Sequence, residues 1–155
     1  MIYSTKKRVL AGLIFLMFAF AFTGCAKKEL IYEKLANHIN IEEDSAYGKI
    51  KMNFDKLDGE DIRAFVTKKG DMYEFNYEYN ISNGDIKIII TDSQENILEQ
   101  TMWNSELEQE LKKEKGDGTV MVNGSGGTFK VKSTDEKIRI VIAGKDATGD
   151  LKIEW

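Results

Sequence analysis

The chain has 155 residues, with 22 Lys and Arg against 26 Asp and Glu, and a formal net charge of −4. That length accommodates one domain and a tail. Because the chain lacks the Lys/Arg excess that neutralises phosphate, its composition argues against a nucleic-acid partner and against electrostatic adhesion to anionic lipid. Cys25 is the only cysteine, which excludes an intramolecular disulfide and a tetrahedral thiolate zinc site.

The N-terminal residues have the composition of a signal peptide. A basic cluster, Lys6-Lys7-Arg8, precedes the uncharged stretch Val9–Phe22, and the small residues Thr23 and Gly24 follow. A positive end, a short apolar core and small residues are the three parts of an export signal. The apolar stretch is shorter than the roughly 20 residues that a spanning helix needs. Cleavage would remove three of the 22 basic residues and no acidic residue, leaving the mature chain near −7.

The sequence Phe22-Thr23-Gly24-Cys25 resembles the lipobox of bacterial lipoproteins, with Phe22 where leucine is common. The resemblance implies a thioether between the Cys25 sulfur and diacylglycerol, with fatty acids such as palmitate, and cleavage between Gly24 and Cys25. It therefore implies a protein held by its lipid on the extracytoplasmic face of the cell membrane. Two acyl chains are sufficient for stable anchoring.

After the cysteine we expect a tether. Lys28–Ile39 places apolar residues at roughly helical spacing, which predicts a short helix, and Glu42-Glu43-Asp44 is typical of a solvated linker. The expected organisation is a signal peptide over 1–24, the lipidated cysteine and tether over 25–45, and a folded domain over 46–155.

From Tyr47 onward the pattern changes to the period of two that a half-buried strand requires. In Tyr73–Ile81, aromatic residues alternate with Glu and Asn, and Asn83-Gly84 then predicts a hairpin to Ile86–Thr91. Ser105 predicts the start of one short surface helix. About eight closely spaced strands predict an antiparallel β-sandwich or barrel-like domain. The other predicted turns are Asp58-Gly59, Gly70-Asp71, Asp92–Asn96, Gly124–Gly127, Thr134–Glu136 and Gly144–Asp150.

Three tyrosines are the candidate ligand-binding residues. Tyr73, Tyr77 and Tyr79 share one face of their predicted strand with Phe75, and flat rings on a sheet suit the faces of sugars. The alternation with Glu and Asn favours the core-facing side of a strand instead. A ligand site remains an alternative if the phenols emerge at a sheet edge.

No motif indicates a metal or a cofactor other than the covalent lipid on Cys25. Asp146 and Asp150 flank a glycine and carry oxygens that calcium could use, although such a pair is more often part of a turn. His38 is the only histidine, so a site built from several imidazoles is excluded. Because no nucleophile-elbow motif is present either, we expect a protein that is not an enzyme.

The composition and the anchor together predict a membrane-anchored, non-enzymatic binding domain whose partner is a protein, a cell-wall glycan or a peptide. One alternative is an immunity-type lipoprotein that captures a cationic membrane-active peptide in an acidic groove. A second is a carboxylate-dependent hydrolase, which would require convergent carboxylates in a cleft.

Overall fold

A computed structural model describes residues 28–103 and 124–155, and all the regular structure in these two ranges is β-strand. It confirms the predicted antiparallel β fold class. The helix predicted from Ser105 and the signal peptide lie outside the described residues. The strands are β1 (Ile31–Lys34), β2 (Asn37–Ile39), β3 (Glu42–Glu43), β4 (Lys49–Val66), β5 (Met72–Thr91), β6 (Ile97–Trp103), β7 (Gly124–Lys132) and β8 (Lys137–Glu154).

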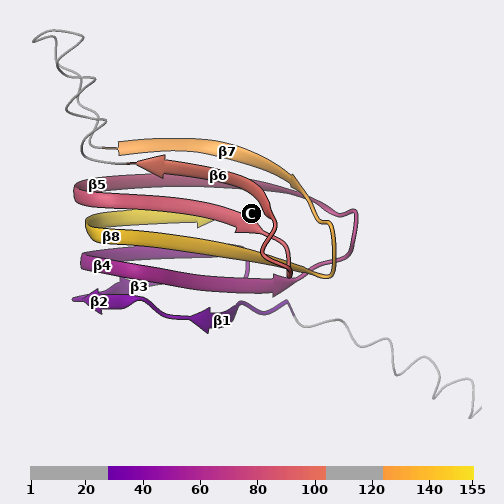
Figure 1. Cartoon of the computed structure of the whole chain (residues 1–155), viewed down its shortest axis with the longest axis horizontal. Helices are drawn as coiled ribbons and strands as arrows, with labels where there is room; N and C mark the ends of the chain where they lie inside the picture. The colour runs from indigo at the N-terminus through magenta and orange to yellow at the C-terminus, as the bar shows by residue number, and fades with distance from the viewer. Residues whose placement is uncertain (1–27, 104–123) are drawn as a thin grey trace, which may run out of the picture.

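Three long strands, β4, β8 and β5, pair side by side and antiparallel, and each contributes to both layers of a sandwich (Figure 1). Their register shifts midway, between Phe54 and Gly59 in β4 and between Ile81 and Asp85 in β5. Such bulges bend a strand and increase its twist. The halves of β4, β8 and β5 that lie on one side of the bend form the first layer with β7. The other halves form the second layer with β6.

The core lies between the two layers and is built from alternate residues of the long strands. Isoleucine dominates it, as expected for a β-branched side chain that packs well on a pleated surface. The most deeply buried large side chains are Ile50, Met52, Phe54, Leu57, Phe65, Phe75, Ile86, Ile88, Ile90, Ile138, Ile140, Ile142, Leu151 and Ile153.

The hairpin predicted at Asn83-Gly84 is wrong, because β5 continues through both residues. The segments on either side of Gly84 pair with β8 and not with each other. Gly84 has a φ of +76°, and a positive φ serves a strand bulge as well as a tight turn. The turns predicted at Asp58-Gly59 and Gly144–Asp150 are wrong for the same reason, since they fall within β4 and β8.

The turn predicted over Gly124–Gly127 is also corrected, because these residues begin β7 and pair with Tyr77–Asn80 of β5. A side chain at Gly127 would collide with the ring of Tyr77. The glycine here therefore makes room for an aromatic residue of the neighbouring strand, a recognised use of glycine within strands.

The helix predicted over Lys28–Ile39 and the linker predicted over Glu42-Glu43-Asp44 are wrong as well. Strands β1, β2 and β3 lie there, and each pairs with β4. Leu35 is 61% exposed, so the apolar spacing does not mark a buried helix face. We call residues 31–43 the N-terminal strap, because they follow the edge of β4 across both layers and thereby cover an edge that would otherwise be unpaired.

The turns predicted around Gly70-Asp71, Asp92–Asn96 and Thr134–Glu136 are confirmed. They gather at one end of the sandwich, which we call the loop end, and the bends of the long strands lie at the opposite corner end (Figure 1). Trp103 and Gly124 pair with residues next to the bend in β5 and so belong to the corner end. Among the described residues, none lies in a helix of the length and hydropathy that crossing a membrane requires.

Candidate functional site

A cleft of about 520 Å³ opens at the loop end of the sandwich. It lies where the chain preceding the N-terminal strap meets the connection from β4 to β5. Concave sites with apolar walls and a few polar groups are the usual locations of small-ligand binding. The cleft is lined by Lys28, Glu29, Tyr47, Val66, Thr67, Lys68, Asp71, Met72 and Tyr73.

The floor of the cleft is a cluster of aromatic rings. Tyr47 meets Phe65 edge to face at 5.6 Å between ring centroids, and Phe65 meets Tyr73 at 5.2 Å. Trp155 stacks on Phe65 at 5.1 Å and also contacts Tyr47 at 6.1 Å. Packed aromatic pairs add stabilisation beyond the area they bury. Their contacts with Phe65 therefore hold the rings of Tyr47 and Tyr73 in place at the cleft.

The polar groups of the cleft are of both signs. The Lys28 ammonium lies 5.3 Å from the centroid of the Tyr47 ring, within the range of a cation–π interaction. Burial raises the pKa of the Tyr47 phenol, and the neighbouring Tyr73 and Asp71 raise it further. Tyr47 therefore stays neutral at ordinary pH and retains a proton that it can donate to a ligand.

Two apolar side chains form part of the rim of the cleft. Val66, the last residue of β4, is 59% exposed, and Met72, the first residue of β5, is 64% exposed. Both line the cleft together with Lys68. The loop end therefore has a solvent-exposed apolar edge beside the cationic and anionic groups of the cleft.

The three tyrosines that the sequence singled out are divided among different surroundings. Tyr73 lines the cleft. Tyr77 is half-buried and packs against Phe129 at 4.7 Å between ring centroids, and Tyr79 is only 5% exposed. The three rings therefore do not form one open platform.

The sequence does not indicate Tyr47 or Lys28 as site residues. Tyr47 precedes the first alternating strand, and Lys28 precedes the strap, so neither carries a local pattern that indicates a site. The pairing of β4 with β8 brings Trp155 beneath Tyr47, through a backbone hydrogen bond of 3.1 Å from the Trp155 amide to the Gly48 carbonyl. Only the long-range fold assembles the cleft.

The pair considered for calcium belongs to the corner end. Asp146 forms an ion pair with Lys56, and Asp150 accepts a hydrogen bond of 3.4 Å from Asn80. The Lys56 ammonium holds the pKa of Asp146 below its usual value. In the described ranges no group of three or more His, Cys, Asp or Glu side chains is arranged to hold a metal ion.

His38 belongs to a buried polar cluster beneath the N-terminal strap. Its Nε2 lies 2.6 Å from Asp61 Oδ2, and Asp61 Oδ1 accepts hydrogen bonds from Arg63 and from the Ala36 amide. Asp61 and Arg63 are fully buried. Arg63 also reaches Glu43 of β3 at 3.3 Å. Every partner of this cluster lies in the strap or in β4, so its arrangement fastens the strap to the sandwich.

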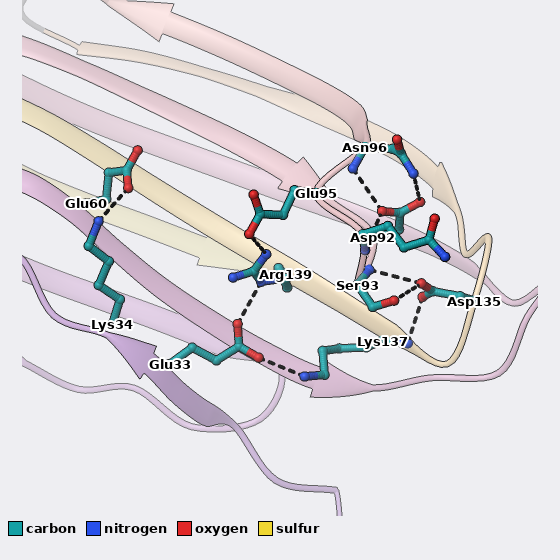
Figure 2. A network of polar contacts seen from close by, with 11 residues as sticks. Glu33, Lys34, Glu60, Asp92, Ser93, Glu95, Asn96, Asp135, Lys137 and Arg139 are labelled. Carbon is teal, nitrogen blue, oxygen red and sulfur yellow. Dashed lines mark hydrogen bonds and ion pairs between the residues drawn. The ribbon is translucent and has the colours of Figure 1, made fainter.

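A second polar network covers the outer surface near the loop end (Figure 2). Glu33 of the strap pairs with Lys137 at 2.9 Å and with Arg139 at 2.7 Å, and Arg139 continues to Glu95. Burial opposes ionisation of Glu33, but the hydrogen bonds from Lys137 and Arg139 lower its pKa overall. These charges compensate one another and join the strap to β8.

A smaller hollow of about 280 Å³ lies over Gly126 and Gly127 on the outer face of the first layer. Four of its polar side chains are paired with one another: Thr128 donates to Asn76 at 2.8 Å, and Lys152 pairs with Glu154 at 3.0 Å. The loop-end cleft is larger and has an aromatic floor, and we take it as the candidate site.

No protein-family model and no curated protein sequence matches the chain. Among solved structures, it is similar to a CBM4 structure, with 9% identity, a TM-score of 0.43, and coverage of 79% of this chain and 77% of that one. A TmCBM61 in complex with β-1,4-galactotriose gives 12% identity, a TM-score of 0.39, and coverage of 83% and 85%. The carbohydrate-binding module CBM6cm-2 of Cellvibrio mixtus lichenase 5A, in complex with cellotriose, gives 10% identity, a TM-score of 0.38, and coverage of 81% and 95%. Because these TM-scores are low, the sandwich assignment rests on the strand pairing described above.

Proposed function

We propose that this protein is a lipoprotein anchored through Cys25 on the extracytoplasmic face of a membrane, and that its β-sandwich binds a ligand without catalysing a reaction. The observation that carries the binding role is the loop-end cleft, where Tyr47 and Tyr73 stand on an aromatic floor beside Lys28 and Asp71. The lipobox-like sequence ending at Cys25 supports the anchor.

Binding accounts for the cleft better than hydrolysis does. The cleft is lined by two carboxylates, Glu29 and Asp71, and by two lysines, Lys28 and Lys68. A carboxylate-dependent hydrolase instead needs one carboxyl group positioned as the acid and a second positioned as the base or nucleophile. The same mixture of charges differs from the acidic groove that capture of a cationic peptide would favour.

The anchor is tested with a Cys25→Ala variant expressed in a bacterium supplied with labelled fatty acid. The parent chain should incorporate the label and remain in the membrane fraction. The variant should incorporate none and either accumulate as uncleaved precursor or leave the membrane. Unchanged processing and retention of the variant would refute the anchor.

The binding role is tested through Trp155, whose ring lies beneath the cleft. A Trp103→Phe variant leaves Trp155 as the only tryptophan, so its emission reports on this end of the domain. Cell-wall oligosaccharides, synthetic peptides and lipid vesicles are then titrated in turn. We expect one of them to shift the emission, and Tyr73→Ala should abolish that shift. A shift that survives Tyr73→Ala would place binding elsewhere, and no shift with any of the three would count against the cleft.

A further inference from the structure

We propose that the loop-end cleft faces the membrane and that its ligand is the phospholipid of that bilayer. This proposal rests on the lipid anchor at Cys25 and deepens the proposed function by naming the class of ligand. It begins from the position of Lys28, which lines the cleft and follows Cys25 by three residues.

The covalent chain limits how far the cleft can lie from the bilayer. An extended chain advances about 3.3–3.6 Å per residue, so three residues reach at most about 11 Å. A lipidated Cys25 has its acyl chains in the membrane, and Lys28 must therefore stay close to the headgroups. The N-terminal strap, which begins at Ile31, is held to β4 by three paired segments, so the chain between Cys25 and the sandwich is only a few residues long.

The rim has the chemistry of a membrane interface. Val66 and Met72 are exposed apolar side chains that suit the boundary of the acyl region. Tyrosine is enriched at the headgroup level of membranes, and Tyr47 and Tyr73 stand just inside this rim. Lysine side chains extend along apolar surfaces while keeping their ammonium groups among polar headgroups.

Lysines of the cleft provide donors for the phosphate of a lipid. Lys28 and Lys68 line it directly, and Glu29 and Asp71 balance their charge. The contact should therefore not require anionic lipid, which agrees with the acidic composition of the chain. The corner end offers a different surface, because the residues around its bends include the exposed polar side chains of Asp55, Ser82 and Asn83.

Two exposed methionines provide a matched test of orientation. Met72 lies on the rim of the cleft, whereas Met102, which is 55% exposed, lies on β6 next to Trp103 at the corner end. Met72→Cys and Met102→Cys are prepared in the lipidated protein, where the Cys25 sulfur is blocked by its thioether, and are labelled with the same fluorophore. Each protein is reconstituted into phosphatidylcholine vesicles that carry a nitroxide quencher on a fraction of the lipid.

The label at position 72 should be quenched several-fold more strongly than the label at position 102. Equal quenching, or stronger quenching at position 102, would overturn the proposal. Incorporation of labelled fatty acid is measured on the same samples. Lipidated protein with an unquenched position 72 therefore refutes the membrane-facing cleft and leaves the anchor intact, whereas absence of lipidation refutes the anchor itself.

A second measurement separates lipid binding from proximity to the membrane. Residues 26–155 with Trp103→Phe carry no lipid, and phosphatidylcholine vesicles should shift the emission of Trp155. The double variant Val66→Ser/Met72→Ser should have a several-fold lower apparent affinity for vesicles and an unchanged urea midpoint. The control Met102→Ser should leave the affinity for vesicles unchanged. A cell-wall oligosaccharide that shifts Trp155 and is not displaced by vesicles would overturn phospholipid as the ligand while keeping a binding cleft.

Discussion

At the scale of single residues, the buried charge of Arg63 depends most strongly on the polar groups placed around it. Its guanidinium is fully buried and reaches Asp61, Glu43 and the Lys34 carbonyl, and it also lies 4.2 Å from the centroid of the Tyr32 ring. Removing a charge from water is costly unless its partners are well placed. Most of these partners belong to the N-terminal strap, so the strap and Arg63 depend on each other.

Asp61→Ala should therefore destabilise the domain by about 3–5 kcal/mol, because it removes the only fully buried carboxylate that pairs with Arg63 among the described residues, together with the acceptor of the Ala36 amide. Urea unfolding followed by tryptophan emission measures this loss. Lys34→Ala provides the control, since the exposed pair between Lys34 and Glu60 should contribute less than about 1 kcal/mol. Similar losses for the two variants would show that Asp61 does not hold the cluster together.

At the scale of elements, the bends of the long strands shape the molecule. In β5 the bend requires Gly84, which has a φ of +76°. A side chain added at this position would collide with the backbone of Asp146 in β8. Gly149 of β8 faces the Asn80 carbonyl in the same way. Close approach of backbones is the reason glycine is needed at such positions.

Gly84→Ala should cost at least about 2 kcal/mol, because it combines an unfavourable φ with a collision against backbone that cannot move aside. Gly70→Ala is the matched control, with a similar φ of +95° but no atom within 4 Å of the added carbon. It should cost about 1 kcal/mol from the backbone conformation alone. The comparison is made by thermal and urea unfolding, and equal costs would contradict a steric role for the bend.

The sequence predicts the strands of this fold better than their connections. The period of two that begins after Tyr47 puts Ile50, Met52 and Phe54 on one face of a strand, because the side-chain period of a strand is fixed, and all three are buried. A positive-φ dipeptide such as Asn83-Gly84 is locally the same in a tight turn and in a bulge. Only pairing with β8, distant in the sequence, distinguishes the two. The cleft is likewise assembled from Lys28, Tyr47 and Tyr73 by long-range pairing, so no local sequence pattern indicates it.

The carboxylates of the polar network near the loop end should make the free energy of unfolding depend on pH in the acidic range. The pKa values of Glu33, Asp92 and Asp135 are lowered in the folded protein. Besides the bonds to Glu33 described above, the causes are hydrogen bonds from Asn96 to Asp92 and from Ser93 to Asp135. A folded state with lowered carboxyl pKa values binds fewer protons than the unfolded chain. Its stabilisation is therefore complete above the unfolded pKa values, 4.5 for Glu and 3.8 for Asp, and is lost as the pH falls through the lower folded values.

The urea midpoint should accordingly fall as the pH is lowered from about 5 toward 3. Glu33→Gln should lessen that fall, because the amide has no proton to gain over this range. Glu99→Gln, at an exposed position on β6, is the control and should follow the parent protein. A midpoint that does not respond to pH between these values would contradict the contribution of the network.

At the scale of the whole molecule, the strap makes the N-terminal segment part of the domain. Strand pairing with β4, the buried cluster around Arg63 and the pairs of Glu33 all join residues 31–43 to the sandwich. We therefore expect that the folding unit begins before Ile31, and that the boundary at 46 suggested by the sequence pattern cuts through it.

Two truncations test this boundary. A chain of residues 28–155 should unfold in urea with the same midpoint as residues 26–155, because it retains the strap. A chain of residues 46–155 should lose cooperative unfolding or show a far lower midpoint, since it leaves the Arg63 guanidinium without Glu43 and exposes the edge of β4. The variant 46–155 with Asp61→Ala and Arg63→Leu removes the buried charges, and partial recovery of its midpoint would assign part of the loss to them. Equal midpoints for 28–155 and 46–155 would show that the strap lies on the sandwich without stabilising it, and the domain would then begin near β4.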